Sequence, residues 1–145
     1  MVLYLDTSAL LKRYVTEAES EHVLAKMDEA TAITTALITR TEVAAALSKA
    51  QRGTRINAEQ ARRAEEEFLE DWADFGKVPV TEELAERAGQ LSWSRELRAY
   101  DAVQLAAALR CQPILARYDQ DTVFACFDKK LRQAARAEGL ETWPA

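Results

Sequence analysis

The chain is 145 residues long, with 48% hydrophobic residues, 30% charged residues and a formal net charge of −5 at pH 7. This length and balance suit one globular domain spanning residues 1–145, and no apolar run approaches the roughly 20 residues needed to cross a bilayer. The acidic net charge argues weakly against a nucleic-acid-binding protein, although cations held by clustered carboxylates would reverse the sign locally.

Helical and strand patterns alternate along the chain. Val2–Leu5 is a continuous apolar run ending at Asp6, which predicts a strand buried on both faces. The next predicted elements are a helix over Thr7–Val15, a helix over Glu19–Glu29, a strand over Ala32–Thr35 and a helix over Thr39–Gln51 closed by Gly53. A long helix over Asn57–Phe75 follows, ended by Gly76, with Phe68, Trp72 and Phe75 on a stripe that we interpret as core-facing.

The second half of the chain continues the alternation. Its predicted elements are a strand over Lys77–Val80, a helix from Thr81 to about Ser94, an apolar helix over Tyr100–Leu109, a strand over Thr122–Phe127, a helix over Asp128–Glu138 and a strand over Leu140–Trp143. Strands that alternate with helices predict an α/β fold with a mainly parallel sheet covered on both faces. Ligands of such sheets bind beyond the carboxyl ends of the strands, so functional residues are expected just after strands or at helix starts.

Histidine and cysteine chemistry is limited by composition. His22 is the only histidine, which excludes Ser-His-Asp, Cys-His and histidine–zinc sites, and we interpret it as a surface residue. Cys111 and Cys126 have no CxxC spacing and are interpreted as reduced core thiols. The N-terminal residues lack the basic segment of a signal peptide, so we expect a cytoplasmic protein. Any catalysis must then come from carboxylates.

Four carboxylates stand at the expected places. Asp6 ends the first strand, Glu42 is in the first turn of the helix after the second strand, Asp101 starts the apolar helix, and Asp128 follows the fourth strand. Each has a simpler explanation: Asp6 and Asp128 suit helix N-caps, Glu42 could close a capping box with Thr39, and Asp101 suits a helix N-terminus. Capping explains the set less well, because Glu42 and Asp101 precede very apolar segments where an unpaired charge is costly.

Four segments, LYLDTSALLKRY, TRTEVAAAL, LRAYDAVQLAAAL and VFACFDKKLRQAARAEGL, resemble the PIN-domain family, and specifically its VapC-type toxins of type II toxin–antitoxin systems. By this resemblance, the acidic metal-binding quartet of the family is matched by Asp6, Glu42, Asp101 and Asp128. The resemblance implies a Rossmann-like, three-layer α/β/α sandwich and RNA cleavage that depends on one or two Mg²⁺ or Mn²⁺ ions. It also implies a cognate VapB-like antitoxin as inhibitor and a homodimer. Thr7 and Ser8 match the hydroxyl-bearing positions after the first aspartate, which the resemblance implies assist the site through hydrogen bonds around the metal-binding acids.

One position departs from the family pattern. Cys126 stands where the family commonly has threonine or serine, two residues before the last acid, and a thiol is a weaker donor and a poor ligand for hard cations. Asp119 and Asp121 compete with Asp128 for the fourth acidic position. We prefer Asp128, because the other two lie in a polar loop before the predicted strand.

An all-carboxylate set suits Mg²⁺ or Mn²⁺ and disfavours zinc. Two such ions about 4 Å apart could activate a water and stabilise both oxygens of an in-line displacement, and one ion with four carboxylates stays open. We expect Asp6 and Asp101 to provide most of the ligation. Among the basic residues that flank these segments, Lys12 and Arg98 are the preferred contacts to substrate phosphate.

Two other functions fit the same acids. One is a non-toxin metal-dependent nuclease or phosphoesterase, although a haloacid-dehalogenase-like phosphatase would need a second aspartate where Ser8 stands. The other is a catalytically weak module that acts through an antitoxin complex. Intact acids at all four positions favour the ribonuclease.

Overall fold

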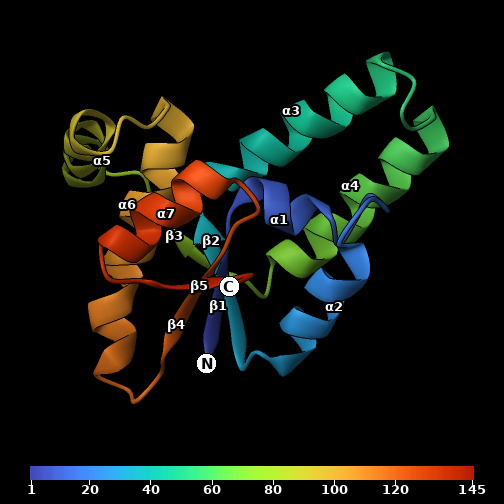
Figure 1. The fold of residues 1–145 in the computed structure, drawn as a ribbon. Coiled ribbons are helices and arrows are strands. Elements are labelled where there is room, and N and C mark those ends of the chain that lie inside the picture. The colour runs from blue at the N-terminus through green and yellow to red at the C-terminus, as the bar shows by residue number, and fades with distance from the viewer.

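Strands and helices alternate through the computed structural model, which describes all residues from Met1 to Ala145 (Figure 1). The strands are β1 (Val2–Leu5), β2 (Ala32–Ala36), β3 (Gly76–Val78), β4 (Thr122–Ala125) and β5 (Glu141–Trp143). The helices are α1 (Thr7–Leu11), α2 (Ser20–Glu29), α3 (Thr39–Arg52), α4 (Ala58–Trp72), α5 (Glu82–Ser94), α6 (Ala99–Ala116) and α7 (Lys129–Ala137). None of them combines the length and hydrophobicity of a membrane-spanning segment.

The strands form one sheet in the order β3-β2-β1-β4-β5, and every neighbouring pair is parallel. Val2 of the central strand pairs with Ala32 on one side and Thr122 on the other. The strand order therefore reverses at β1, and the carboxyl ends of β1 and β4 flank the switch point where open α/β sheets bind ligands. The predicted parallel sheet is confirmed.

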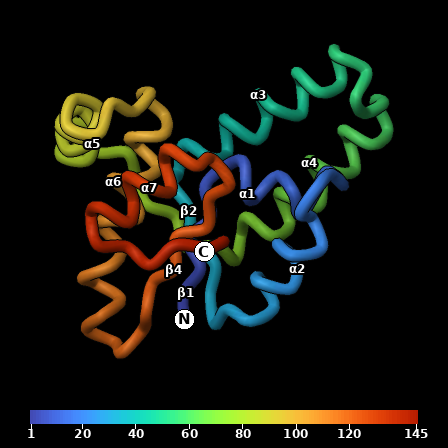
Figure 2. The backbone as a smooth tube through the Cα atoms, viewed as in Figure 1, coloured from blue at the N-terminus to red at the C-terminus, as the bar shows by residue number.

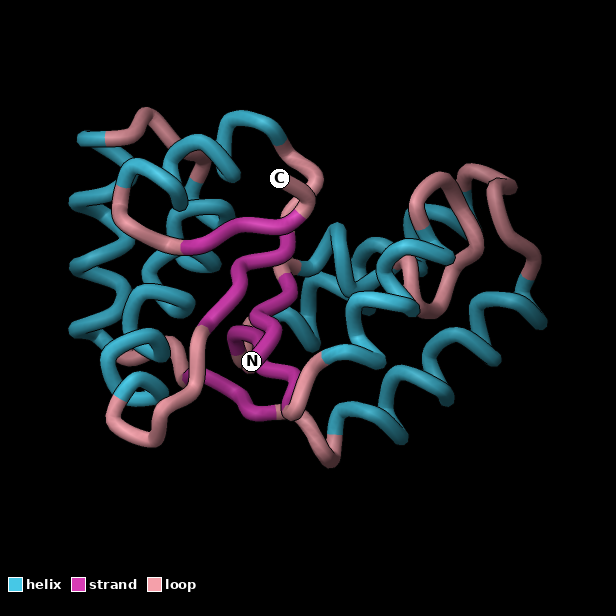
Figure 3. The backbone as a smooth tube through the Cα atoms, turned by 60° about the horizontal axis from the view of Figure 1, so that its bottom comes forward, coloured by secondary structure: helices cyan, strands magenta, loops and turns pink.

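Two cores cover the two faces of the sheet. Successive residues of a strand point to opposite faces, so Tyr4 packs in one core with α5, α6 and α7, whereas Leu3 and Leu5 pack in the other with α1, α3 and α4. Figure 3 shows the sheet between these two groups of helices. The three-layer α/β/α sandwich is thus confirmed, and β1 is buried on both faces as its unbroken apolar run predicts.

Helices α3 and α4 form a hairpin that extends from the body of the molecule (Figure 2). Asn57 caps α4 through a reciprocal capping box with Gln60, which explains the sharp start of this helix. Phe68, Trp72 and Phe75 are buried, with the rings of Phe68 and Trp72 5.3 Å apart. The predicted core stripe is confirmed.

Several predicted boundaries are wrong. Helix α1 ends at Leu11 instead of Val15, because the following N–H groups, from Lys12 to Tyr14, bond three residues back in tighter turns. Helix α6 runs to Ala116, seven residues beyond the predicted Leu109. Pro113 lies inside it, because a proline removes one backbone hydrogen bond of a helix without necessarily ending it.

The segment between α4 and β3 also differs from the prediction. Helix α4 ends at Trp72, short of the predicted Phe75, and β3 covers Gly76–Val78 instead of Lys77–Val80. Gly76 is the first residue of the strand and pairs with Thr34. A Cβ at Gly76 would lie 2.7 Å from Thr34 Oγ1, so this glycine permits close strand approach in addition to ending a helix pattern. At the other edge, β4 ends at Ala125, two residues early, and β5 begins at Glu141.

Candidate active site

Asp6 lies at the junction of β1 and α1, where the strand ends and the helix begins. Its Oδ1 accepts the Ala9 N–H at 2.8 Å, which confirms the N-cap interpretation. The Ser8 hydroxyl lies 3.0 Å from both carboxylate oxygens of Asp6 and donates to this acid. Only 5% of Asp6 is exposed, so the side chain is a buried acid at the sheet edge.

Burial dominates the electrostatics of Asp6. It raises the carboxyl pKa from 3.8 to about 6, against the lowering effect of hydrogen bonds from the Ala9 N–H and the Ser8 hydroxyl, and the charge of Asp101 raises it further. No basic side chain forms an ion pair with Asp6 among the salt bridges of the molecule. A buried carboxylate without a cationic partner is costly, and a bound cation would remove that cost.

Glu42 is not part of a capping box. Helix α3 has no side-chain cap, because the Thr39 hydroxyl turns into the core and lies 2.8 Å from Thr35 Oγ1. Glu42 Oε1 instead accepts the Thr7 hydroxyl at 2.9 Å and the Gln104 Nε2 amide at 2.8 Å. The capping-box explanation of Glu42 is therefore wrong, and Glu42 is hydrogen-bonded to Thr7 and Gln104 instead.

Asp101 and Asp128 complete the set of acids. Asp101 is in the first turn of α6, and Asp128 caps α7 by accepting the Leu131 N–H at 2.8 Å. The pKa of Asp101 is raised, mainly by burial and also by the charge of Asp128, whereas the nearby Arg98 lowers it. Because Asp101 is repelled by both Asp6 and Asp128, these three carboxylates share one electrostatic environment.

The competing acids of the fourth position lie elsewhere. Asp119 and Asp121 are exposed and precede β4, whereas Asp128 follows it. The Asp121 carbonyl accepts the Val2 N–H at 2.8 Å, so Asp121 stands at the amino end of the central strands. Neither residue lies at the sheet edge that carries Asp6 and Asp128.

Cys126 fills the space beside Asp6 and Asp128. Its thiol is free and buried, and the sulfur lies 3.6 Å from the Asp128 carbonyl oxygen. Burial raises the pKa of the thiol, as do the charges of Asp6 and Asp128, so Cys126 stays protonated and neutral. Cys111 is also free but only partly buried, so the prediction of two core thiols is confirmed fully for Cys126 alone.

The two basic residues expected to contact phosphate, Lys12 and Arg98, differ in their exposure and in the contacts they already make. The Lys12 ammonium donates to Glu17 Oε1 at 3.2 Å and to the Ala18 carbonyl at 3.0 Å, so it is already engaged. Arg98 Nε lies 3.5 Å from Asp101 Oδ2, and 86% of its side chain is exposed. Arg98 is thus the better placed of the two for an incoming anion.

The acids fit a hard cation by donor type and electrostatics, since every donor is a carboxylate oxygen and the charge of Asp101 repels those of Asp6 and Asp128. No three acidic, histidine or cysteine side chains converge tightly enough to form a complete metal-binding group. To hold a cation, Asp6, Glu42, Asp101 and Asp128 would have to lie closer to one another than they do in this structure.

A buried polar network behind Glu42 was missed from the sequence. Gln104, 2% exposed, accepts the Tyr4 hydroxyl at 2.7 Å and donates to Glu42 and to Thr39 Oγ1. One signal was available: Gln104 is the only polar residue between Asp101 and Leu109 in an otherwise apolar helix, one turn after Asp101 on the same face.

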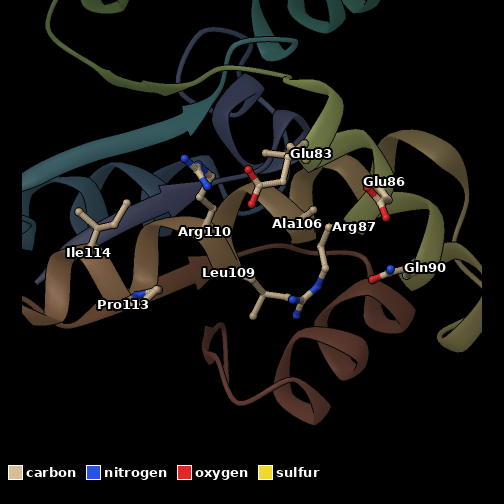
Figure 4. A pocket seen from close by; sticks show the side chains of 10 residues that line it. Glu83, Glu86, Arg87, Gln90, Ala106, Leu109, Arg110, Pro113 and Ile114 are labelled. Atoms are coloured by element: carbon tan, nitrogen blue, oxygen red, sulfur yellow. The ribbon is translucent and has the colours of Figure 1, made fainter.

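A pocket of about 430 Å³ between α5 and α6 contains none of the four acids. Figure 4 shows its lining of mixed charge, with Glu83, Glu86 and Arg87 from α5 opposite Arg110 from α6. Its side chains are flexible and of both signs, so this pocket offers no matched set of groups for catalysis.

The capping role of Asp128 gives a prediction about stability. Asp128→Ala is expected to destabilise the protein by about 1 kcal/mol, because α7 loses its N-cap acceptor, whereas Asp128→Asn retains an acceptor and changes stability by less than about 0.5 kcal/mol. Urea denaturation of both variants measures the difference. Equal destabilisation by alanine and asparagine would show that the carboxylate charge, and not the cap, stabilises this position.

Known proteins resemble this chain in sequence and in structure. A family model described as PIN domain matches residues 3–137. Two curated relatives from Mycobacterium tuberculosis, Ribonuclease VapC45 and Ribonuclease VapC49, are each 33% identical over 144 residues, covering 99% of this chain and 96% of theirs.

Solved structures share the fold at lower identity. A structure of FitAcB from Neisseria gonorrhoeae matches with a TM-score of 0.70 and 18% identity, covering 98% of this chain and 96% of that chain. A structure of VapBC2 from Rickettsia felis, bound to a DNA fragment from their promoter, matches with a TM-score of 0.62 and 14% identity, covering 98% and 97% of the two chains.

Proposed function

This chain belongs to the PIN-domain family, and from this premise we propose that it is the ribonuclease toxin of a type II toxin–antitoxin pair. In this proposal the protein acts in the cytoplasm and hydrolyses RNA phosphodiester bonds with one or two Mg²⁺ or Mn²⁺ ions. The names of the two Mycobacterium tuberculosis relatives, which cover nearly the whole chain, support ribonuclease activity.

The observation that carries the proposal is the buried, unpaired carboxylate of Asp6. Burying a charged carboxylate without a cationic partner is costly, even when hydrogen bonds satisfy its oxygens. Asp6 lies at the carboxyl end of the central strand, and the charge of Asp101 raises its pKa further. This arrangement is expected of a site that is completed by a cation from solution.

The residues of the site have distinct roles in this proposal. Asp6 and Asp101 hold the cation, and Glu42 and Asp128 complete its surroundings or orient water. A bound divalent cation supplies an activated water and charge neutralisation at the scissile phosphate. Ser8 holds the Asp6 carboxylate and Thr7 holds Glu42 through the hydrogen bonds described above. Arg98, the exposed basic residue beside Asp101, contacts a substrate phosphate.

The proposed partner is a small VapB-like antitoxin. The solved structural neighbours include toxin–antitoxin assemblies, such as the VapBC2 structure and a toxin–antitoxin complex from Klebsiella pneumoniae. A groove of about 330 Å³ between α3 and α4 has an exposed lining that includes Ala44 and Leu69 beside Arg40 and Glu65, and it offers a partly apolar surface for a partner segment. The proposal includes a homodimer, for which light scattering should give twice the monomer mass of 16.3 kDa.

One observation favours a second function. Because no three potential ligands converge into a complete metal-binding group, a catalytically weak module that acts through its antitoxin complex is the second candidate. This candidate predicts tight antitoxin binding together with an absence of RNA cleavage.

Cleavage of total cellular RNA by the purified, antitoxin-free protein tests the proposal. We expect discrete fragments with Mn²⁺ or Mg²⁺ and none with EDTA, because the acids need a cation to act. Cleavage that persists in EDTA would overturn the metal-dependent mechanism. No cleavage with either metal by a folded protein would leave the second candidate as the better account.

A further inference from the structure

The position of Glu42 depends on contacts from two other helices. Glu42 is partly buried in the first turn of α3, and its flexible side chain would lose entropy on adopting one orientation. Its Oε1 accepts two hydrogen bonds, from the Thr7 hydroxyl of α1 and the Gln104 amide of α6. Oε2 accepts none, so one oxygen is held and the other is free.

Gln104 is itself held in one orientation. Its Oε1 accepts the hydroxyl of Tyr4, which is fully buried in β1, so Nε2 must face the other way, toward Glu42. Nε2 lies 2.8 Å from Glu42 Oε1, 2.9 Å from Thr39 Oγ1 and 3.3 Å from Thr7 Oγ1. A carboxylate accepts hydrogen bonds only, so the amide end that faces Glu42 is the donor end that the network requires.

The same network reaches the backbone next to Asp6. Thr39 Oγ1 lies 2.8 Å from Thr35 Oγ1, and Thr35 donates to the Leu5 carbonyl at 2.8 Å. Each hydroxyl therefore donates in turn, from the Gln104 amide through Thr39 and Thr35 to the residue that precedes Asp6. Hydrogen bonds therefore connect Glu42 through Gln104, Thr39 and Thr35 to the backbone of the residue before Asp6, although Asp6 and Glu42 are 36 residues apart in sequence.

We propose that Gln104 is a positioning residue that fixes Glu42 Oε1, so that Oε2 is presented to the cation and its water. This inference rests on the function proposed above and assigns a role to a residue outside the four acids. Groups that hydrogen-bond metal-binding side chains orient them and tune their affinity, and their loss typically lowers metal affinity or activity about 10- to 100-fold. Gln104 does this from the helix that also carries Asp101, so one helix supplies both a ligand and the support of another.

The alternative role is structural: Gln104 would serve only to satisfy the buried Tyr4 hydroxyl. The two roles separate in a double variant. Gln104→Leu removes the hydrogen bonds to Glu42 and to Tyr4, and it leaves the buried Tyr4 hydroxyl without a partner. Tyr4→Phe combined with Gln104→Leu removes that hydroxyl as well. If the role is positioning, the second substitution restores stability but not the support of Glu42.

Mn²⁺ titration by calorimetry on the full-length protein, beside a urea denaturation curve, provides the test. We expect the Tyr4→Phe/Gln104→Leu variant to recover part of the urea midpoint lost in Gln104→Leu, yet to bind Mn²⁺ about 10- to 100-fold more weakly than wild type. Thr7→Val, which removes the other donor to Glu42 Oε1, is expected to weaken Mn²⁺ binding in the same direction. Thr7→Val replaces the Tyr4→Phe/Gln104→Leu variant in the test if the double variant does not fold.

Leu84→Ala in α5 is the control for general destabilisation, since Leu84 is buried in the same core and takes part in none of the hydrogen bonds of the network. It should lower the urea midpoint and leave Mn²⁺ affinity unchanged. Wild-type affinity in both the double variant and Thr7→Val would overturn the positioning role while leaving the ribonuclease proposal intact. Absence of Mn²⁺ binding by the wild-type protein would overturn both.

Discussion

Asp6→Asn is expected to reduce metal-dependent RNA cleavage roughly 100-fold or more, because the loss of a metal-binding carboxylate removes several kcal/mol of transition-state stabilisation. Asparagine keeps the shape of the side chain and the oxygen that accepts the Ala9 N–H, so α1 keeps its cap. The comparison therefore isolates the charge. Initial rates of cleavage of a defined RNA, measured with saturating Mn²⁺, give the effect.

The matched control is Asp74→Asn, which removes an exposed carboxylate that follows α4 and has no side-chain partner. It changes the net charge by the same amount as Asp6→Asn but lies outside the site, so its cleavage rate should stay within about twofold of wild type. Equal rates for wild type and Asp6→Asn would contradict a role for this carboxylate in metal binding.

Asp6→Asn is also expected to stabilise the metal-free protein, by about 1–3 kcal/mol at pH 8. The pKa of Asp6 rises from 3.8 in the unfolded chain to about 6 in the folded protein, which corresponds to roughly 3 kcal/mol of stability lost when the group is ionised in both states. The folded protein holds this proton more tightly, so the contribution of Asp6 becomes unfavourable as the pH rises from about 4 to 6. Well below pH 3.8 the acid is neutral in both states and the penalty disappears.

Urea denaturation of wild type and Asp6→Asn in EDTA, at pH 8 and at pH 4, measures this effect. The variant should be more stable at pH 8, and the difference should shrink toward zero at pH 4. Mn²⁺ at pH 8 should raise the stability of wild type more than that of the variant, because it binds the folded site that retains the charge. A variant less stable than wild type at pH 8 would show that burial of the ionised Asp6 carboxylate does not destabilise the folded protein.

The parallel sheet and the positions of the acids could be predicted because their signals are local. The apolar run Val2–Leu5, ending at Asp6, specifies a strand that is buried on both faces, and the alternation of strands and helices specifies parallel pairing. Parallel pairing then brings the carboxyl ends of β1 and β4 together, so Asp6 and Asp128 follow the same edge of the sheet although they are 122 residues apart.

The contacts of Glu42 could not be predicted because they depend on tertiary structure. Thr39 and Glu42 have the spacing of a capping box, a short-range pattern that competes with any partners brought in by the fold. In the folded chain Gln104 and Thr35 are those partners, and they bind the two side chains that the box would have used. The end of α6 was predicted wrongly for a similar reason. The apolar stripe of this helix stops at Leu109, but its backbone hydrogen bonds continue to Ala116.

The most direct test of the central claim, that these carboxylates hold the catalytic cation, is the anomalous difference map of a crystal grown with Mn²⁺. We expect a peak at the carboxyl ends of β1 and β4, within coordination distance of Asp6 and Asp101, with Glu42 Oε2 and Asp128 facing it directly or through water. A peak at another place on the protein, or none at Mn²⁺ concentrations that support RNA cleavage, would contradict it.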